Sequence, residues 1–183
     1  MPRDVDGRFI ERPEVHVNAL DPLLDRLSSA VARIAATRAA VEAGAPWPVG
    51  AVAEGGGEAE WGPTEVLAHV SEMLPYWLGE MERVIEGSRL DAGPAAFGRT
   101  ATDQIRTLSV VRDATLPPRE LFDRIGSSAQ RYRLRLPLVT ETEAAAVGLH
   151  PTRGELAVPA LIEQLVVSHL EDHADQLEAA IGG

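Results

Sequence analysis

Two histidines stand four residues apart near the end of the chain, in the stretch VPALIEQLVVSHLEDHADQLEAAI at 158–181. On a helix this spacing places His169 and His173 on one face, one turn apart. The apolar seam of the stretch continues through both positions, so the sequence predicts that both imidazoles face the protein interior. An unsatisfied polar group inside a protein is costly. The pair therefore fits either a metal site or hydrogen-bonded core histidines.

A third histidine, His69, favours the metal interpretation. It lies in TEVLAHVSEML beside an apolar seam of its own, so it can also point inward. Helical proteins build metal sites from a pair of side chains on one helix and single ligands on others. Three imidazoles leave a divalent ion with room for water or substrate, which is typical of a catalytic site. Imidazole suits zinc, nickel, iron and copper, so the ion stays open.

Carboxylates near these histidines are candidates for orienting them. Glu65 and Glu72 stand four residues before and three residues after His69, and either could orient its free ring nitrogen or move a proton. Asp172 could do the same for His169. Each of these acids also fits an ordinary solvated helix face.

Other chemistry is excluded or weakly indicated by the sequence. The run HLEDH is not HExxH, and the chain has no P-loop, no Rossmann fingerprint and no G-x-S-x-G elbow. The absence of cysteine excludes disulfides, thiolate catalysis and cysteine-ligated metals. His150, in a loop beside Pro151, is predicted to face solvent or a site lip, and His16 to lie on the first helix's surface. The arginines of RYRLRL at 131–136 are interpreted as a solvated surface.

The composition describes an acidic protein with many helix-forming residues. The 183 residues carry a formal charge of −11, from 28 acids and 17 basic residues that are all arginine. Without a basic run, the chain lacks the electrostatic pattern of a nucleic-acid binder, and an anionic membrane surface would repel it. No apolar run approaches 18 residues, and the N-terminus does not resemble a signal peptide. We therefore predict a cytoplasmic protein.

The elements that must position the histidines are predicted to be helices. A polar arm at 1–13 precedes one helical domain at 14–183. Long amphipathic helices with period 3.6 are expected at 14–43, 64–88, 119–139 and 158–181, and a short helix at 103–113. Pro75 should bend the second of these helices. Since no convincing period-2 strand is found, the sequence predicts an all-α four-helix bundle with long interhelical loops.

The phrase WGPTEVLAHVSE, followed about a hundred residues later by SHLEDHADQL, resembles the DinB/YfiT-like superfamily of proposed metalloenzymes. Members share a four-helix bundle and three histidines, to which His69, His169 and His173 correspond. Gln176 matches a glutamine that often follows the last histidine, and Trp61 a tryptophan that often precedes the second helix. The stretch HPTRGELAVPALIEQLV is also similar to the lead into the last helix of many relatives. The resemblance covers about 14–181.

The resemblance implies a bound zinc, nickel or similar ion, unusual handedness of the helix connections, and frequently a homodimer. Some relatives are thiol-dependent enzymes, including mycothiol-dependent maleylpyruvate isomerases and bacillithiol or glutathione S-transferases, and others have no known activity. We therefore expect a thiol-dependent S-transferase or a hydrolase that acts on a small molecule. The alternative is a non-catalytic, stress-associated bundle that binds a metal or ligand. The Gly-rich loop before Trp61 resembles a variable insertion that bears on substrate rather than on metal.

Overall fold

The structure, a computed structural model, describes residues 18–90 and 93–182. The predicted arm at 1–13, His16 and the start of the predicted first helix lie outside these residues. The α-helices are α1 Asp21–Ala36, α2 Arg38–Gly44, α3 Pro63–Ser88, α4 Gln104–Asp113, α5 Pro118–Arg135, α6 Glu141–Ala144, α7 Val158–Ile162 and α8 Ser168–Ile181. The strands are β1 Ala95–Ala96, β2 Val147–His150 and β3 Gly154–Ala157. Short turns of other helix types are η1 Glu58–Glu60, η2 Leu136–Leu138 and η3 Glu163–Val167.

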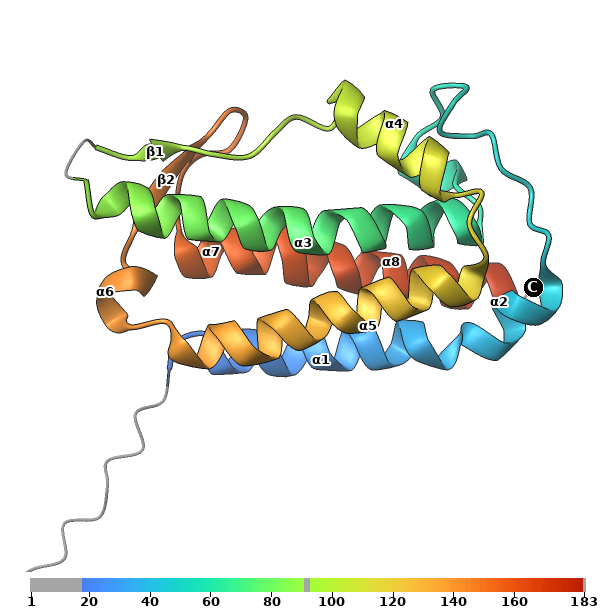
Figure 1. Cartoon of the computed structure of the whole chain (residues 1–183), viewed down its shortest axis with the longest axis horizontal. Helices are drawn as coiled ribbons and strands as arrows, with labels where there is room; N and C mark the ends of the chain where they lie inside the picture. Colours follow the sequence, from blue (N-terminus) through green and yellow to red (C-terminus); the bar gives the residue numbers. More distant parts are fainter. Residues whose placement is uncertain (1–17, 91–92, 183) are drawn as a thin grey trace, which may run out of the picture.

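The protein is mainly helical, as predicted, and its long helices run beside one another (Figure 1). The helix α3 packs against α4, α5 and α8, while α1 packs against α5 and α8. The apolar faces of these helices form one continuous core that includes Leu27, Leu74, Leu121 and Leu170, each fully buried. Within the described residues, no helix is both long enough and apolar enough to cross a membrane.

The helix α3 begins close to the predicted position. Pro63 occupies its first turn, where the missing N–H costs nothing, and Glu65 Oε2 accepts a hydrogen bond from Gly62 N at 3.0 Å. The helix continues without a break through Pro75. The short helix predicted at 103–113 is confirmed as α4, whose first turn is capped by the Asp103 side chain.

The predicted first helix is wrong in one respect, because it is two helices. The helix α1 ends at Ala36 and α2 begins at Arg38, with Thr37 between them. The Thr37 hydroxyl donates to the Ile34 carbonyl at 2.7 Å, and the Thr37 N–H donates to the same oxygen at 3.1 Å. A threonine that bonds the preceding turn in this way competes with the helical hydrogen-bond ladder.

The prediction of no strands is also wrong. The strands β2 and β3 form an antiparallel hairpin, and β1 pairs with β2 in parallel. These strands are too short to show a period in the sequence. Gly148 is required at the centre of β2, because a Cβ there would lie 2.5 Å from Val84 Cγ2. The hairpin leads directly into α7, so it fixes the start of the last helical segment.

The last predicted helix is present but contains a wider turn. Five residues, Glu163–Val167, form a π-helical turn between α7 and α8. Such a turn accommodates one extra residue and is frequently found at functional sites. Removing one residue from a helix rotates all the later side chains about the axis by about 100°. The turn therefore sets the direction in which His169 and His173 leave α8.

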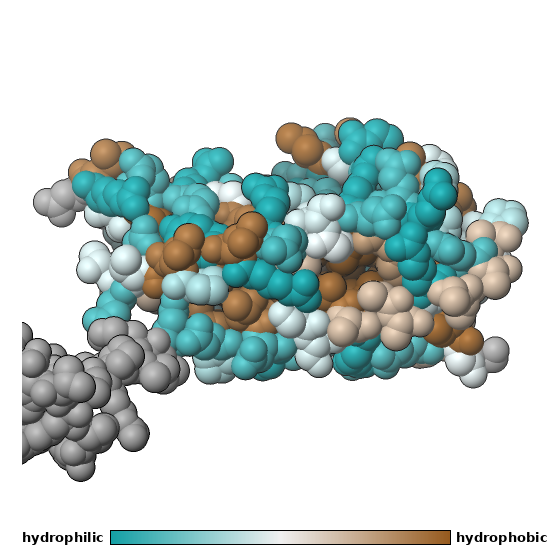
Figure 2. All heavy atoms as spheres, turned by 60° about the horizontal axis from the view of Figure 1, so that its bottom comes forward, coloured by the Kyte–Doolittle hydropathy of each residue, from teal (hydrophilic) through white to brown (hydrophobic). Residues whose placement is uncertain are grey.

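A groove lies between α1 and α5, on a face away from the histidines. Its volume is about 730 Å³, and its apolar lining includes Val31, Ile34, Phe122 and Ile125. Figure 2 brings this face forward and shows apolar atoms in a hollow among hydrophilic ones. The residues that line this groove are not shared with the histidine cluster.

Candidate metal centre

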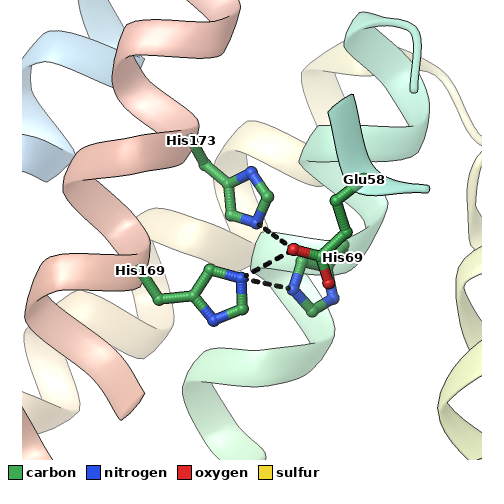
Figure 3. Close-up of side chains that lie close together, drawn as sticks. All are labelled: Glu58, His69, His169 and His173. Atoms are coloured by element: carbon green, nitrogen blue, oxygen red, sulfur yellow. Dashed lines mark hydrogen bonds and ion pairs between the residues drawn. The ribbon is translucent and has the colours of Figure 1, made fainter. Parts of the chain in front are cut away.

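Four side chains from three segments converge on one point (Figure 3). His69 comes from α3, His169 and His173 from α8, and Glu58 from the turn η1 in the Gly-rich loop. One nitrogen or oxygen from each residue lies within 4.8 Å of those from the other three. The structure thus brings together the three predicted histidines and adds a carboxylate that the sequence did not indicate.

Two of the distances between these atoms equal those expected around a four-coordinate ion, and a third is somewhat longer. His69 Nε2 and His169 Nε2 are 3.4 Å apart, and His169 Nε2 is 3.3 Å from Glu58 Oε2. His173 Nε2 lies 4.0 Å from the same oxygen. Ligand atoms about 2.1 Å from a tetrahedral ion are separated by about 3.4 Å. These four residues could therefore hold a metal ion.

The protonation states also suit a metal. Burial, with the neighbouring His169, lowers the pKa of His173 to about 4. Burial likewise lowers the pKa of His69 well below its usual value, and His173 adds to this effect. The hydrogen bond to His169 lowers the pKa of Glu58 to about 2, with a smaller contribution from Arg106. Around neutral pH the cluster presents two neutral buried imidazoles and a carboxylate, the forms that metals require.

Gln176 fixes the orientation of His173. Its Nε2 donates to the carbonyl oxygens of Glu58 at 2.6 Å and Trp61 at 3.3 Å, so its Oε1 faces His173. The Oε1 atom can only accept, and His173 Nδ1 at 3.0 Å therefore carries the proton. His173 Nε2 is then an unprotonated, buried atom without a hydrogen-bond partner. An unpartnered lone pair directed at the cluster is what a metal ligand needs.

The other candidates for orienting the histidines do not contact them, and those predictions are wrong. The Glu65 carboxylate accepts from the backbone N–H groups of Gly50 at 2.8 Å, Val52 at 3.2 Å and Gly62 at 3.0 Å. Glu72 pairs with Arg99, and Asp172 is exposed. Periodicity places Glu65 on the same helix face as His69, but it does not show that the carboxylate binds the loop backbone instead.

The Gly-rich loop is part of the site, contrary to its interpretation as an insertion unrelated to the metal. Glu65 Oε1 accepts a hydrogen bond from Gly50 N of this loop, and Gln176 Nε2 donates one to the Glu58 carbonyl oxygen. Arg106 on α4 forms an ion pair with Glu58 and lies over the Trp61 ring, 5.2 Å from its centroid. Sequence reasoning missed both Glu58 and Arg106, because neither has a regular spacing to the histidines.

His150 is buried, so the expectation that it faces solvent is wrong, whereas the alternative position beside the site agrees with the structure. It is 4% exposed and packs against Phe97 and Trp77, with ring centroids 5.4 and 6.0 Å away. The ring lies tightly against Gly98, whose Cβ, if present, would be 2.4 Å from His150 Cδ2. His150 shares a cavity of about 160 Å³ with Glu58, His69 and His169. The hairpin end thus forms one wall of the site.

The metal-free protein is expected to lose stability on acidification between pH 6.5 and pH 4. The folded state holds the pKa of His173 at about 4, so the unfolded chain binds a proton in this interval that the folded chain does not. The loss attributable to His173 is at most about 3 kcal/mol in the free energy of unfolding. Urea unfolding of metal-free protein at several pH values measures it. The substitution His173→Gln should reduce this pH dependence, and an unchanged dependence would contradict the assignment.

Known proteins supply no relative from which a residue's role could be carried over to this site. No family model, no curated protein and no solved structure matches the chain. The resemblance to DinB/YfiT-like proteins rests on short motifs around Trp61, His69 and His169, and it stays a prediction. The chemistry of the site is therefore argued from its own residues.

Proposed function

We propose that this chain is a four-helix bundle of the DinB/YfiT-like type that binds one divalent transition metal ion. His69, His169 and His173 would hold the ion through their Nε2 atoms. The Glu58 carboxylate would either occupy the fourth coordination position or lie beside it. The observation that carries the proposal is the convergence of these four atoms at spacings of 3.3–4.0 Å between measured pairs. Zinc, nickel and iron all suit this set of ligands.

We further propose that the site catalyses a reaction of a small molecule, either transfer to a low-molecular-weight thiol or hydrolysis. A divalent ion supplies Lewis acidity and lowers the pKa of a bound water or thiol toward neutrality. Glu58 is placed to accept the proton, since its carboxylate touches the ligand atoms and its side chain is 38% exposed. Arg106 fixes this carboxylate by an ion pair. A cavity beside the cluster leaves room for the reacting molecule.

A non-catalytic metal-binding protein is the second candidate, and the position of Glu58 favours it. Four protein ligands close a tetrahedral site, which is typical of structural metals. Cobalt-substituted protein distinguishes the candidates, because cobalt absorbs visible light according to its ligands. If azide or 2-mercaptoethanol changes the spectrum, an exchangeable position exists and the enzymatic proposal stands. An unchanged spectrum in the wild type, with a change in Glu58→Ala, identifies Glu58 as a permanent fourth ligand and refutes the enzymatic proposal.

Location and assembly belong to this proposal as well. The resemblance implies a homodimer and suggests a role in a stress response, whereas the cytoplasmic location is proposed from the sequence alone. Analytical ultracentrifugation tests the homodimer directly, with and without added zinc.

The substitution Gln176→Ala is expected to lower metal affinity by about 10- to 100-fold, the usual effect of losing a group that orients a ligand. It removes the hydrogen bond that fixes His173 and frees the loop at Glu58 and Trp61. Competition with a chromophoric chelator measures the change. Gln130→Ala, at an exposed position on α5, is the matched control and should bind like the wild type. Equal affinity of the two variants would exclude a role for Gln176.

A further inference from the structure

The cavity beside the histidine cluster carries more positive than negative charge, although the protein as a whole carries −11. Arg99, Arg106 and Arg153 line it, and Glu58 is the carboxylate among its lining residues. A metal ion held by the histidines would add further positive charge. The net charge of the cavity lining is opposite in sign to that of the whole chain. A cavity with this charge attracts negatively charged ligands.

Two of these arginines are already neutralised by carboxylates. Arg99 forms a two-point ion pair with Glu72, and Arg106 pairs with Glu58. Arg153 differs, because its side-chain hydrogen bond joins Nη1 to Gln164 Oε1 at 3.4 Å. Among residues 18–90 and 93–182, no carboxylate forms an ion pair with it. One positive charge at the cavity is therefore left uncompensated.

The hairpin turn carries Arg153, an exposed residue that lines the cavity. His150 Nδ1 accepts a hydrogen bond from Thr152 N at 3.3 Å, which ties the turn to a buried ring. Arg153 and His150, three residues apart across the turn, both line the cavity. His150 lines the same cavity as His69 and His169. The turn thus places an uncompensated cation beside the candidate metal centre.

Part of the remaining cavity wall is apolar, and Thr100 and Thr152 add hydroxyl groups to it. Trp77 and Leu165 line it beside the charged residues. Its volume is about 160 Å³, and a closed cavity of about 150 Å³ accommodates benzene. The cavity therefore fits the end of a small molecule with both an apolar part and a single negative charge.

We propose that the cavity between the hairpin and the histidine cluster binds a small organic monoanion, with Arg153 binding its charged group. This proposal assigns a substrate class to the proposed enzyme. It depends on the proposed function only for the reaction of the bound molecule, and not for its binding. Arg153 is then a residue that determines specificity, and His150 is a positioning residue that holds the turn.

Benzoate and benzamide are suitable probes, because they share one shape and differ in charge. Zinc-loaded and metal-free wild-type protein are titrated with each compound, and binding is followed by NMR chemical shifts. A charge-assisted hydrogen bond to arginine should make benzoate bind about tenfold more tightly than benzamide. In Arg153→Gln this preference should fall to within about twofold, and Arg153→Lys should keep part of it. Arg131→Gln, an exposed arginine on α5, is the matched control and should keep the full preference.

The outcomes separate this proposal from the metal proposal. A preference for benzoate that persists in metal-free protein and is lost in Arg153→Gln supports the anion site, even if elemental analysis finds no metal. A preference seen only with zinc, and unchanged in Arg153→Gln, would show that the carboxylate binds the ion and would overturn the role of Arg153. Equal affinities of the two probes, or no binding of either, would overturn the anion site. Zinc content measured in each variant shows whether the metal centre is intact.

Discussion

The substitution His69→Ala is expected to weaken metal binding by about two to three orders of magnitude. His69 Nε2 lies 3.4 Å from His169 Nε2, and its ring is 1% exposed, so no other side chain can take its place without rebuilding the core. Structural zinc sites with four ligands bind with about 10–16 kcal/mol, or roughly 2.5–4 kcal/mol for each ligand. Loss of one ligand therefore lowers the affinity by about 100- to 1,000-fold. Elemental analysis of untagged protein and chelator competition measure the loss.

The control for this experiment is another buried histidine. His150→Gln changes the same residue type outside the cluster, and it should retain about one equivalent of metal. Circular dichroism of both metal-free variants shows whether the helices are intact. An unchanged metal affinity of His69→Ala, or loss of metal from His150→Gln, would contradict the proposed ligand set.

The substitution Glu65→Ala is expected to destabilise the protein by about 3–5 kcal/mol, which is large for one residue. This carboxylate is 2% exposed and accepts hydrogen bonds from three backbone N–H groups of the loop and the start of α3. Alanine leaves these three donors without their partner, and each hydrogen bond to a charged group contributes about 1.5–3 kcal/mol, though not additively. Chemical denaturation of metal-free protein measures the change in the free energy of unfolding.

Two further variants determine what Glu65 contributes. Glu65→Gln keeps one acceptor oxygen but turns an N–H₂ group toward a donor, so an intermediate loss is expected. Glu54→Ala removes an exposed acid from the same loop and should change stability by less than about 0.5 kcal/mol. If Glu65→Ala were as stable as Glu54→Ala, the loop would not depend on this carboxylate.

The helices and the three histidines could be predicted because both depend on spacing along the chain. The apolar seams at 64–88 and 158–181 correspond to α3 and to the α7–α8 segment. The spacing of four between His169 and His173 correctly placed both imidazoles beside His69. Periodicity reports which face of a helix is buried, and the histidines lie on those faces.

The features that could not be predicted depend on contacts between distant parts of the chain. Glu58 reaches the cluster because its loop is held by Glu65 and Gln176, and no local pattern indicates such a tether. His150 closes a short strand and precedes a proline, which indicates an exposed turn, yet tight packing against Gly98 buries it. Acidic residues on exposed and buried faces look alike in sequence, so Glu65 was assigned the wrong partners.

The large sequence separation between the clustered side chains has a consequence for folding kinetics. Glu58 and His69 precede His169 by 111 and 100 residues, so these groups meet only after the last helix has docked. Contacts of such long range form slowly, because the intervening chain must first be ordered. An ion held between α3 and α8 would then stabilise the native state more than the transition state for folding. We therefore expect added metal to slow unfolding while leaving the folding rate nearly unchanged.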